Sequence, residues 1–306
     1  MPLHIPTPLI ASAPLSRAAG CAIWLKLEAL QPPGSFKIRG IGAACEHYAQ
    51  QGAQRFVSSS GGNAGLAVAY AGRHLSIPVT VVVPETTSQR AKDLLQLEGA
   101  EVIVHGASWQ EANALAQSLL TGSDAFLHPF DDPLLWAGHA SMVDEVAATG
   151  NKPDAVLLSV GGGGLLSGVM EGLARNGWGD VPALGVETQG AASLHAAMQT
   201  GQPTALDAVR SIATSLGARQ VCQRAFELSQ GGKVHSLLVS DKQAVAGCTR
   251  FLDDHRLLVE PACGAALAVA YDMPQALAAF NKVLIIVCGG ATASADNLRQ
   301  WTAQLA

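Results

Sequence analysis

Short apolar runs alternate with longer amphipathic segments along most of the chain, and this alternation restricts the fold more than any other feature. The apolar runs predict strands at 22–27, 55–58, 79–83, 101–104, 155–159, 183–186, 236–239 and 283–287. The amphipathic segments predict helices at 36–49, 64–74, 87–97, 109–120, 133–148, 165–175, 242–253 and 294–304. Strands that are apolar on both faces, with helices between them, are typical of parallel sheets covered on both sides. The sequence therefore predicts an α/β fold.

Composition excludes several classes of protein. The 306 residues are 49% hydrophobic and only 14% charged, which suits a compact enzyme with a large core. A net charge of -5 offers no basic face for nucleic acid, and no run of about 20 apolar residues is present to span a membrane. The start of the chain lacks the pattern of a signal peptide. The six cysteines form no C-x-x-C pair and are expected to be reduced thiols in a cytoplasmic protein.

A lysine stands just after a Pro/Gly turn, at the start of a predicted helix. The turn Pro32-Pro33-Gly34 is irregular, and Ser35 is suited to cap the helix that follows, which places Lys37 in the first helical turn. The helix dipole and unpaired N–H groups there disfavour an ammonium and lower its pKa. A lysine that forms a Schiff base needs such a neutral amine. Read alone, Lys37 is more often a solvated surface residue, so the other motifs decide.

The run Ser58-Ser59-Ser60-Gly61-Gly62-Asn63-Ala64-Gly65 follows a predicted strand and opens a helix. Small residues let the backbone approach a ligand, and the helix N-terminus presents N–H groups to an anion such as a carboxylate or phosphate. Asn63 adds an amide that can bond to a ring hydroxyl. A tight loop with a helix cap explains the same pattern equally well.

Four consecutive glycines, Gly161 to Gly164, stand between the apolar run 155–159 and a predicted helix. A strand, a glycine loop and a helix in this order make a phosphate cradle. The dinucleotide fingerprint fails, because its last position falls on Leu166 or Ser167 rather than on Gly or Ala. The Walker loop fails for lack of its Lys and Ser/Thr. A single phosphate is therefore favoured over a purely structural loop.

The remaining candidates are weaker when read alone. Val287-Cys288-Gly289-Gly290 ends a buried-looking strand, and ligands of open α/β sheets lie beyond the carboxyl ends of strands, so Cys288 could face a cofactor. An inert core cysteine is the commoner case. Glu187 ends another predicted strand, where a carboxylate is usually solvated. His128 and His139 could serve as bases, although most histidines are not catalytic.

Taken together and in this order, these motifs resemble the fold-type II family of pyridoxal 5′-phosphate (PLP) enzymes, and within it the catabolic serine and threonine dehydratases with the serine dehydratase-like proteins. The matching segments, from about Pro6 to the C-terminus, are Gly34-Ser35-Phe36-Lys37-Ile38-Arg39-Gly40, Phe130-Asp131-Asp132-Pro133-Leu134, Gly138-His139-Ala140-Ser141, 160–166, Gly177-Trp178-Gly179-Asp180-Val181-Pro182, Leu258-Val259-Glu260-Pro261-Ala262-Cys263-Gly264-Ala265-Ala266 and Ile286-Val287-Cys288-Gly289-Gly290. The resemblance implies a tryptophan synthase β-like fold of two open, twisted, mainly parallel sheets flanked by helices. It also implies a large PLP-binding domain, 1–37 with 135–306, into which a small domain, 38–134, is inserted.

The resemblance implies roles for individual residues. Lys37 bonds to the PLP aldehyde, and Phe36 packs on the pyridine ring. Asn63 is implied to contact the ring hydroxyl, and Cys288 the pyridine nitrogen. The implied contacts of the cofactor phosphate are Gly161, Gly162, Gly163, Gly164 and Leu165. The implied contacts of the substrate carboxylate are Ser60, Gly61, Gly62 and Asn63. A K⁺ site is implied at Glu187 with backbone oxygens of Gly161, Ala191, Leu216 and Ala218. The implied assembly is a homodimer.

The implied reaction removes water and ammonia from L-serine, giving pyruvate, and from L-threonine, giving 2-oxobutanoate. Two departures from the family pattern bear on it: Gly61 stands where some members carry Ala, and Ala291-Thr292 follow Gly290 where an Asn is expected.

Serine racemase, a D-serine dehydratase and a sulfhydrylase are alternatives within PLP chemistry. A biosynthetic threonine deaminase is disfavoured because no regulatory domain follows. A dinucleotide oxidoreductase is disfavoured by the failed fingerprint, and a non-catalytic metabolite-binding protein is the alternative from another class.

Overall fold

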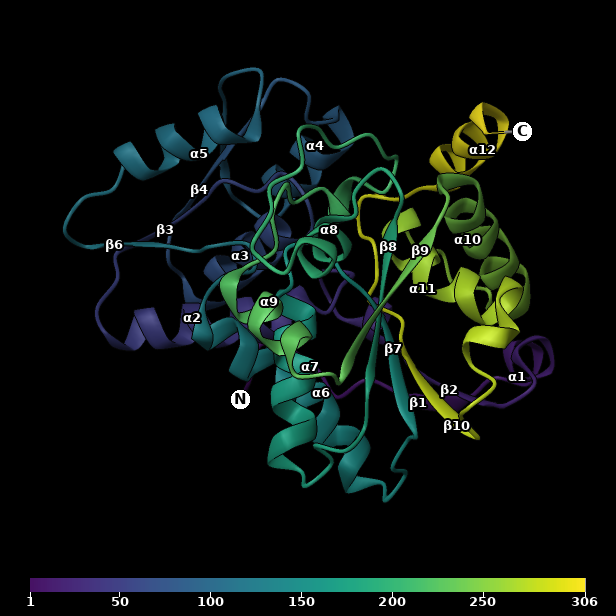
Figure 1. Ribbon diagram of the computed structural model, residues 1–306. Coiled ribbons are helices and arrows are strands. Elements are labelled where there is room, and N and C mark those ends of the chain that lie inside the picture. The colour runs from purple at the N-terminus through teal and green to yellow at the C-terminus, as the bar shows by residue number, and fades with distance from the viewer. Residues whose placement is uncertain (306) are drawn as a thin grey trace.

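Two β-sheets, each covered by helices, make up the computed structural model, which describes residues 1–305 (Figure 1). The larger sheet has six strands, all parallel to their neighbours except the first, which is antiparallel to the second. In spatial order they are β1 (Leu9–Ala11), β2 (Ala22–Lys26), β10 (Lys282–Ile286), β7 (Ala155–Ser159), β8 (Ala183–Thr188) and β9 (Val234–Val239). The crossovers that parallel neighbours require are supplied by helices.

The smaller sheet is entirely parallel and has four strands. In spatial order they are β5 (Glu101–Val104), β4 (Val79–Val83), β3 (Arg55–Ser58) and β6 (Asp124–Phe126). Helices α2 (Lys37–Gln50), α3 (Asn63–Leu75) and α4 (Gln89–Leu97) lie on one side, and α5 (Trp109–Ser118) packs on β3 and β4 from the other. The loops that follow β3 and β7 carry the two glycine-rich motifs, as expected for sites beyond the carboxyl ends of strands.

Helices also cover both faces of the larger sheet (Figure 1). One group is α1 (Ala13–Ala19), α10 (Asp241–His255) and α11 (Pro261–Asp272), with α12 (Ala295–Gln304) packed outside α10. The other group is α6 (Pro133–Ala148), α7 (Gly164–Arg175), α8 (Ser193–Thr200) and α9 (Gln223–Gln230). Short 3₁₀ helices are η1 (Glu28–Leu30), η2 (Thr214–Leu216) and η3 (Pro274–Ala276). Helix α6 packs against both α7 and α2, so it joins the helices of the two sheets.

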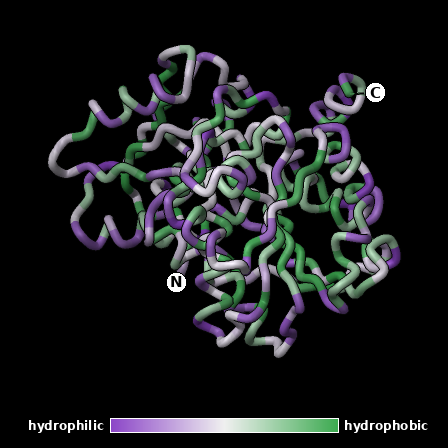
Figure 2. The backbone as a smooth tube through the Cα atoms, viewed as in Figure 1, coloured by the Kyte–Doolittle hydropathy of each residue, from purple (hydrophilic) through white to green (hydrophobic). Residues whose placement is uncertain are grey.

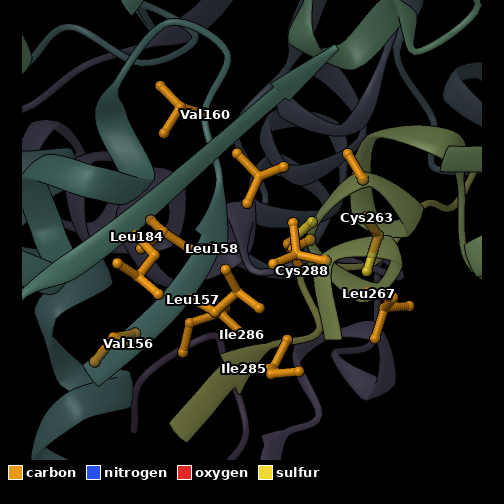
Figure 3. Packing of buried hydrophobic residues seen from close by; sticks show 14 of the residues in the cluster. Val156, Leu157, Leu158, Val160, Leu184, Cys263, Leu267, Ile285, Ile286 and Cys288 are labelled. Atoms are coloured by element: carbon orange, nitrogen blue, oxygen red, sulfur yellow. The ribbon is translucent and has the colours of Figure 1, made fainter. Parts of the chain in front are cut away.

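The core lies between the larger sheet and its helices. All five residues of β7 are buried, and Figure 3 shows Val156, Leu157 and Leu158 packed near Ile285 and Ile286 of β10. Strands buried on both faces explain the unbroken apolar runs in the sequence, which Figure 2 shows as the hydrophobic interior of the fold. Each such Leu or Ile side chain stabilises the fold by about 1.5–3 kcal/mol. Among residues 1–305, no helix is long and apolar enough to cross a membrane.

The predicted α/β fold with two mainly parallel sheets is confirmed, and most predicted elements agree with the structure to within two residues. The elements that the sequence analysis missed are β1, β6, α1, α8, α9 and α11. Helix α11 is the longest of these, and its residues from Pro261 to Tyr271 are all buried. A helix that is apolar on every side has no amphipathic period, so periodicity could not reveal it.

Candidate active site

The amine of Lys37 lies where loops of the two sheets meet. Helix α2 begins at Lys37, one residue after the predicted start, so Lys37 lies in the first helical turn as predicted. The Lys37 Nζ donates a hydrogen bond of 2.5 Å to the carbonyl oxygen of Pro129. Burial lowers the pKa of Lys37 to about 8, against the opposing electrostatic effects of Cys288, Glu260 and Cys222. Because an ordinary lysine titrates near 10.4, this shift greatly increases the fraction of uncharged amine at neutral pH. The side chain therefore has the chemistry of a nucleophilic lysine.

The turn before Lys37 is held by the loop that follows β10. The N–H of Phe36 donates to Cys288 O at 3.0 Å, and the N–H of Gly290 donates to Gly34 O at 3.0 Å. The prediction that Ser35 caps helix α2 is wrong. The capping position is occupied by Phe36 in the helical region (φ -54°, ψ -21°), and the Ser35 hydroxyl is buried without a hydrogen-bond partner. A side-chain cap requires extended backbone at that position, which this turn does not provide.

The four-glycine loop presents a row of unpaired backbone N–H groups within the residues described. Within residues 1–305, the N–H groups of 161–166 have no hydrogen-bond acceptor, and Gly163 takes φ +92° at the start of α7. A Cβ at Gly162 would lie 2.3 Å from the ring of Phe130, and one at Gly163 would lie 2.4 Å from Ala225 Cβ. Only glycine fits these positions, and the free N–H groups at a helix N-terminus form a site for an anion.

The loop before α3 forms a second site of the same kind. The N–H groups of Gly61, Asn63 and Ala64 have no acceptor within residues 1–305, whereas the N–H of Gly62 donates to Ser60 Oγ at 3.3 Å. A Cβ at Gly61 would lie 2.7 Å from Thr87 Cγ2, so the neighbouring turn already fills that space. This geometry suits a small anion such as a carboxylate.

Asn63 connects the two sheets through a buried carboxylate that the sequence analysis did not single out. Its Nδ2 donates to Glu260 Oε1 at 2.7 Å, and its Oδ1 accepts from the N–H of Ala291 at 3.2 Å. Glu260 is buried at the N-terminus of α11, and burial raises its pKa to about 7. The available signal was the Glu260-Pro261 pair, because Pro favours the first position of a helix.

Cys288 is buried beside a second thiol. Its hydrogen bond to Cys263, together with burial, holds the pKa of Cys288 well above its usual value. Figure 3 shows the two cysteines, from the loop after β10 and from α11, among aliphatic side chains of the core. Both sulfurs are free thiols, as are the other four cysteines. Cys288 therefore presents a neutral thiol at any ordinary pH.

Both candidate histidines use Nδ1 to accept a backbone N–H group. His139 is buried, its Nδ1 accepts the N–H of Gly40 in helix α2 at 3.1 Å, and its ring lies 4.8 Å from that of Phe36. Burial lowers its pKa well below the usual value, so it is a neutral support for the first turns of α2. His128 Nδ1 accepts the N–H of Asp131 at 2.8 Å, which orders the loop around Pro129.

Glu187 is a buried residue of β8, so the interpretation of it as a solvated end-of-strand carboxylate is wrong. Its two carboxylate oxygens accept the N–H groups of Leu194 and His195 at 2.8 Å each, at the N-terminus of α8. Burial raises its pKa to about 7. No group of three His, Cys, Asp or Glu side chains suited to a metal ion occurs within residues 1–305.

A buried lysine of lowered pKa, close to two rows of free N–H groups, defines a class of protein. Such a site binds an aldehyde that carries an anionic tail, together with a second, smaller anion. The lysine begins α2, and the two rows begin α3 and α7.

Comparisons with known proteins agree with this class. Residues 1–289 match the family model described as pyridoxal-phosphate dependent enzyme. The chain is 47% identical to the L-serine dehydratase/L-threonine deaminase of Homo sapiens, over 99% of this chain and 96% of that protein. It is 48% identical to a serine dehydratase-like protein of Mus musculus, over 99% and 95% of the two chains. The crystal structure of a fungal L-serine ammonia-lyase from Rhizomucor miehei superposes with a TM-score of 0.94 and 34% identity, covering all of both chains. The chain belongs to the family of pyridoxal-phosphate dependent enzymes.

The residues present fit this cofactor. The free N–H groups of 161–166 suit its phosphate, and the amine of Lys37 suits its aldehyde. The ring of Phe36 has its centroid 5.2 Å from Lys37 Nζ and supplies an apolar surface beside that amine.

Proposed function

We propose that this protein converts L-serine to pyruvate and ammonia, and L-threonine to 2-oxobutanoate and ammonia, as a PLP-dependent ammonia-lyase. The observation that carries the proposal is a buried Lys37 amine of lowered pKa close to two separate anion sites, because the reaction needs one site for the cofactor phosphate and another for the substrate carboxylate. The identity to L-serine dehydratases over nearly the whole chain supports the choice of substrate.

PLP, when bound, supplies an aldehyde that bonds to amines and a ring that delocalises the charge left when a proton departs from the α-carbon. The protein contributes the groups that orient the substrate and move its proton. The N–H groups of Gly61, Asn63 and Ala64 hold the substrate carboxylate, which fixes the α-carbon relative to Lys37. The Nζ of Lys37, whose pKa burial lowers to about 8, accepts the α-proton in its uncharged form.

The neutral thiol of Cys288 is the group proposed for the pyridine nitrogen. A thiol does not protonate that nitrogen as a carboxylate would, so charge is delocalised less far and the β-hydroxyl is lost promptly. The other proposed contacts follow the pattern of the family: Phe36 on the ring, Gly161, Gly162, Gly163, Gly164 and Leu165 at the phosphate, Asn63 at the ring hydroxyl, and Ser60, Gly61, Gly62 and Asn63 at the substrate carboxylate.

The test is to add L-serine to the purified holoenzyme and assay pyruvate, with Lys37→Ala as the control. The proposal expects pyruvate and ammonia in equal amounts from the wild type and none from the variant. Parallel assays with D-serine, and with sulfide, separate this reaction from a D-serine dehydratase and a sulfhydrylase. Chiral analysis of the serine that remains after the reaction separates the ammonia-lyase from a racemase, whose main product is D-serine.

Further parts of the proposal concern the cation and the assembly. We infer a K⁺ site at Glu187 with backbone oxygens of Gly161, Ala191, Leu216 and Ala218. Its support is that no Lys or Arg within residues 1–305 pairs with the buried Glu187 carboxylate, so a bound cation would stabilise its ionised form. We also infer a cytoplasmic homodimer, with 1–37 and 135–306 as the large domain and 38–134 as the small one.

A further inference from the structure

We propose that Glu260 is a positioning residue, which orients the Asn63 amide toward the cofactor and sets the charge environment of Lys37. The inference deepens the proposed function and rests on it for the role of Asn63. It concerns a carboxylate that has no part in the reaction as described above.

The first step of the argument is the geometry of the amide. Asn63 Oδ1 accepts the N–H of Ala291 at 3.2 Å, and one Nδ2 hydrogen is donated to Glu260 Oε1 at 2.7 Å. An amide has one carbonyl and two N–H bonds, so these contacts fix which end is which, and the second N–H makes only a long contact to Ser215 Oγ that a ligand can displace. Without the carboxylate, Asn63 would keep only the Ala291 contact and a long one of 3.5 Å to Ser215 Oγ.

The second step is that Glu260 is itself held firmly. It occupies the N-terminal cap of α11 with extended backbone (φ -86°, ψ 163°), and its N–H donates to Gly289 O at 3.3 Å. A Cβ at Gly290 would lie 2.6 Å from Glu260 Cβ, so the loop after β10 presses directly on it. A second hydrogen bond joins its carboxyl group to Ser215. Glu260 thus transmits the position of the larger sheet to an amide on α3.

The third step is charge. The titratable groups that interact with the Glu260 carboxyl group are Lys37 from α2, Cys248 from α10 and Cys288 from the loop after β10. The pKa of each of these two thiols is raised above its usual value, so the protonated form of Lys37 is the group of opposite charge. The Glu260 carboxylate raises the pKa of Lys37, partly opposing the effect of burial. A Glu260→Gln substitution, which removes the negative charge and keeps the shape of the side chain, must therefore lower the pKa of Lys37.

The experiment compares Glu260→Ala, which removes both hydrogen bond and charge, with Glu260→Gln, which keeps the oxygen that accepts from Asn63 and removes only the charge. Both are prepared as apoprotein, and the binding of PLP is measured by fluorescence titration. We expect Glu260→Ala to bind PLP about tenfold more weakly, because the loss of a charge-assisted hydrogen bond costs about that much affinity. We expect Glu260→Gln, which keeps the acceptor oxygen, to stay within about threefold of wild type. In an Asn63→Ala background, Glu260→Ala should cause no further loss.

The second measurement is the pH dependence of the rate at which the apoprotein forms its covalent bond with PLP, because that step requires an uncharged lysine. We expect the midpoint to move to lower pH in Glu260→Gln. A Glu260→Ala protein with wild-type PLP affinity would overturn the proposal, and so would a Glu260→Gln protein that binds PLP as weakly as Glu260→Ala or shows an unchanged midpoint. If Glu260→Ala does not fold, Glu260→Gln and its midpoint still decide. None of these measurements depends on turnover of L-serine, so they can be interpreted even if the protein does not act on L-serine.

Discussion

The Nζ of Lys37 lies 2.5 Å from the carbonyl oxygen of Pro129, and the next residue of the same loop, Phe130, covers Gly162 of the glycine loop. One short loop thus contacts both the reactive amine and the proposed phosphate site. The loop is ordered by His128 Nδ1, which accepts N–H groups of Phe130 and Asp131 at 3.3 and 2.8 Å. The separation of aldehyde and phosphate sites is therefore set by packing between loops of the two sheets.

Lys37→Ala should abolish covalent attachment of PLP and formation of pyruvate, because the chain would lack the amine of lowered pKa at this position. Borohydride reduction followed by peptide mass spectrometry should find the cofactor on the peptide that contains Lys37 in the wild type, and nowhere in the variant. Lys92, which is half-buried on α4, provides the matched control: Lys92→Ala should label as the wild type does. Cofactor on another lysine in Lys37→Ala would contradict the assignment.

Gly162→Ala should weaken both folding and PLP binding, because the added Cβ would lie 2.3 Å from the Phe130 ring. Overpacking of this kind costs about 1–3 kcal/mol of folding free energy. Urea denaturation of the apoprotein measures the loss of stability, and PLP titration measures the loss of affinity. Phe130→Leu in the same chain should restore part of the stability. An unchanged denaturation midpoint in Gly162→Ala would contradict the contact.

The amine and the two glycine-rich loops could be predicted from the sequence because each is a local pattern of turn, strand end and helix start. Glu260 could not, since its contact with Asn63 joins residues 197 positions apart, and α11 behind it has no amphipathic period. The error at Ser35 has a different cause. Residue type suggested a helix cap, but the loop after β10 places the preceding turn, and so the backbone angles at Phe36 decide the cap.

Gly61→Ala should alter the KM for L-serine, because the new methyl would lie 2.7 Å from Thr87 Cγ2 and the two groups would press on each other. Either the substrate loop or the turn of Thr87 must move, because real Cβ atoms essentially never come this close to another heavy atom. We expect a KM for L-serine several-fold above that of the wild type, and Thr87→Ser, which removes the obstructing methyl, should bring it back. Steady-state kinetics of the two single variants and the double variant test the coupling. Additive effects would show that the two residues act independently.

Cys288→Asp should alter the fate of the substrate, since the neutral thiol would be replaced by a carboxylate able to keep the pyridine nitrogen protonated. We expect a shift in the visible absorbance of the holoenzyme and a lower ratio of pyruvate to transamination product. Cys288→Asn, which is polar but uncharged, is the control and should keep the wild-type product ratio. Because Cys288 is buried beside Cys263 and near Glu260, the Asp variant should also be less stable. Identical spectra and ratios in wild type and Cys288→Asp would remove the thiol from this role.

Glu187 should make the protein less stable as pH rises. Its pKa in the folded state is raised from 4.5 to about 7 by burial, so the folded protein binds this proton more tightly than the unfolded chain does. The contribution is present in full below about pH 4.5 and is lost as pH rises to about 7, and the shift corresponds to about 3 kcal/mol. Glu187→Gln, which keeps an oxygen acceptor for α8, should lack this pH dependence. The difference in unfolding free energy between the two proteins, measured in urea from pH 4.5 to 8, isolates it from other titrating groups.

The same pair of proteins tests the cation. At pH 8 the Glu187 carboxylate is ionised, and a K⁺ ion bound beside it would offset the unfavourable burial of that charge. Replacing tetramethylammonium by K⁺ at constant ionic strength should therefore raise the Tm of the wild type and leave that of Glu187→Gln nearly unchanged. At pH 5, where the carboxyl group is protonated, the effect of K⁺ on the wild type should disappear. An equal effect of K⁺ on both proteins, or the same effect at both pH values, would place the ion away from Glu187.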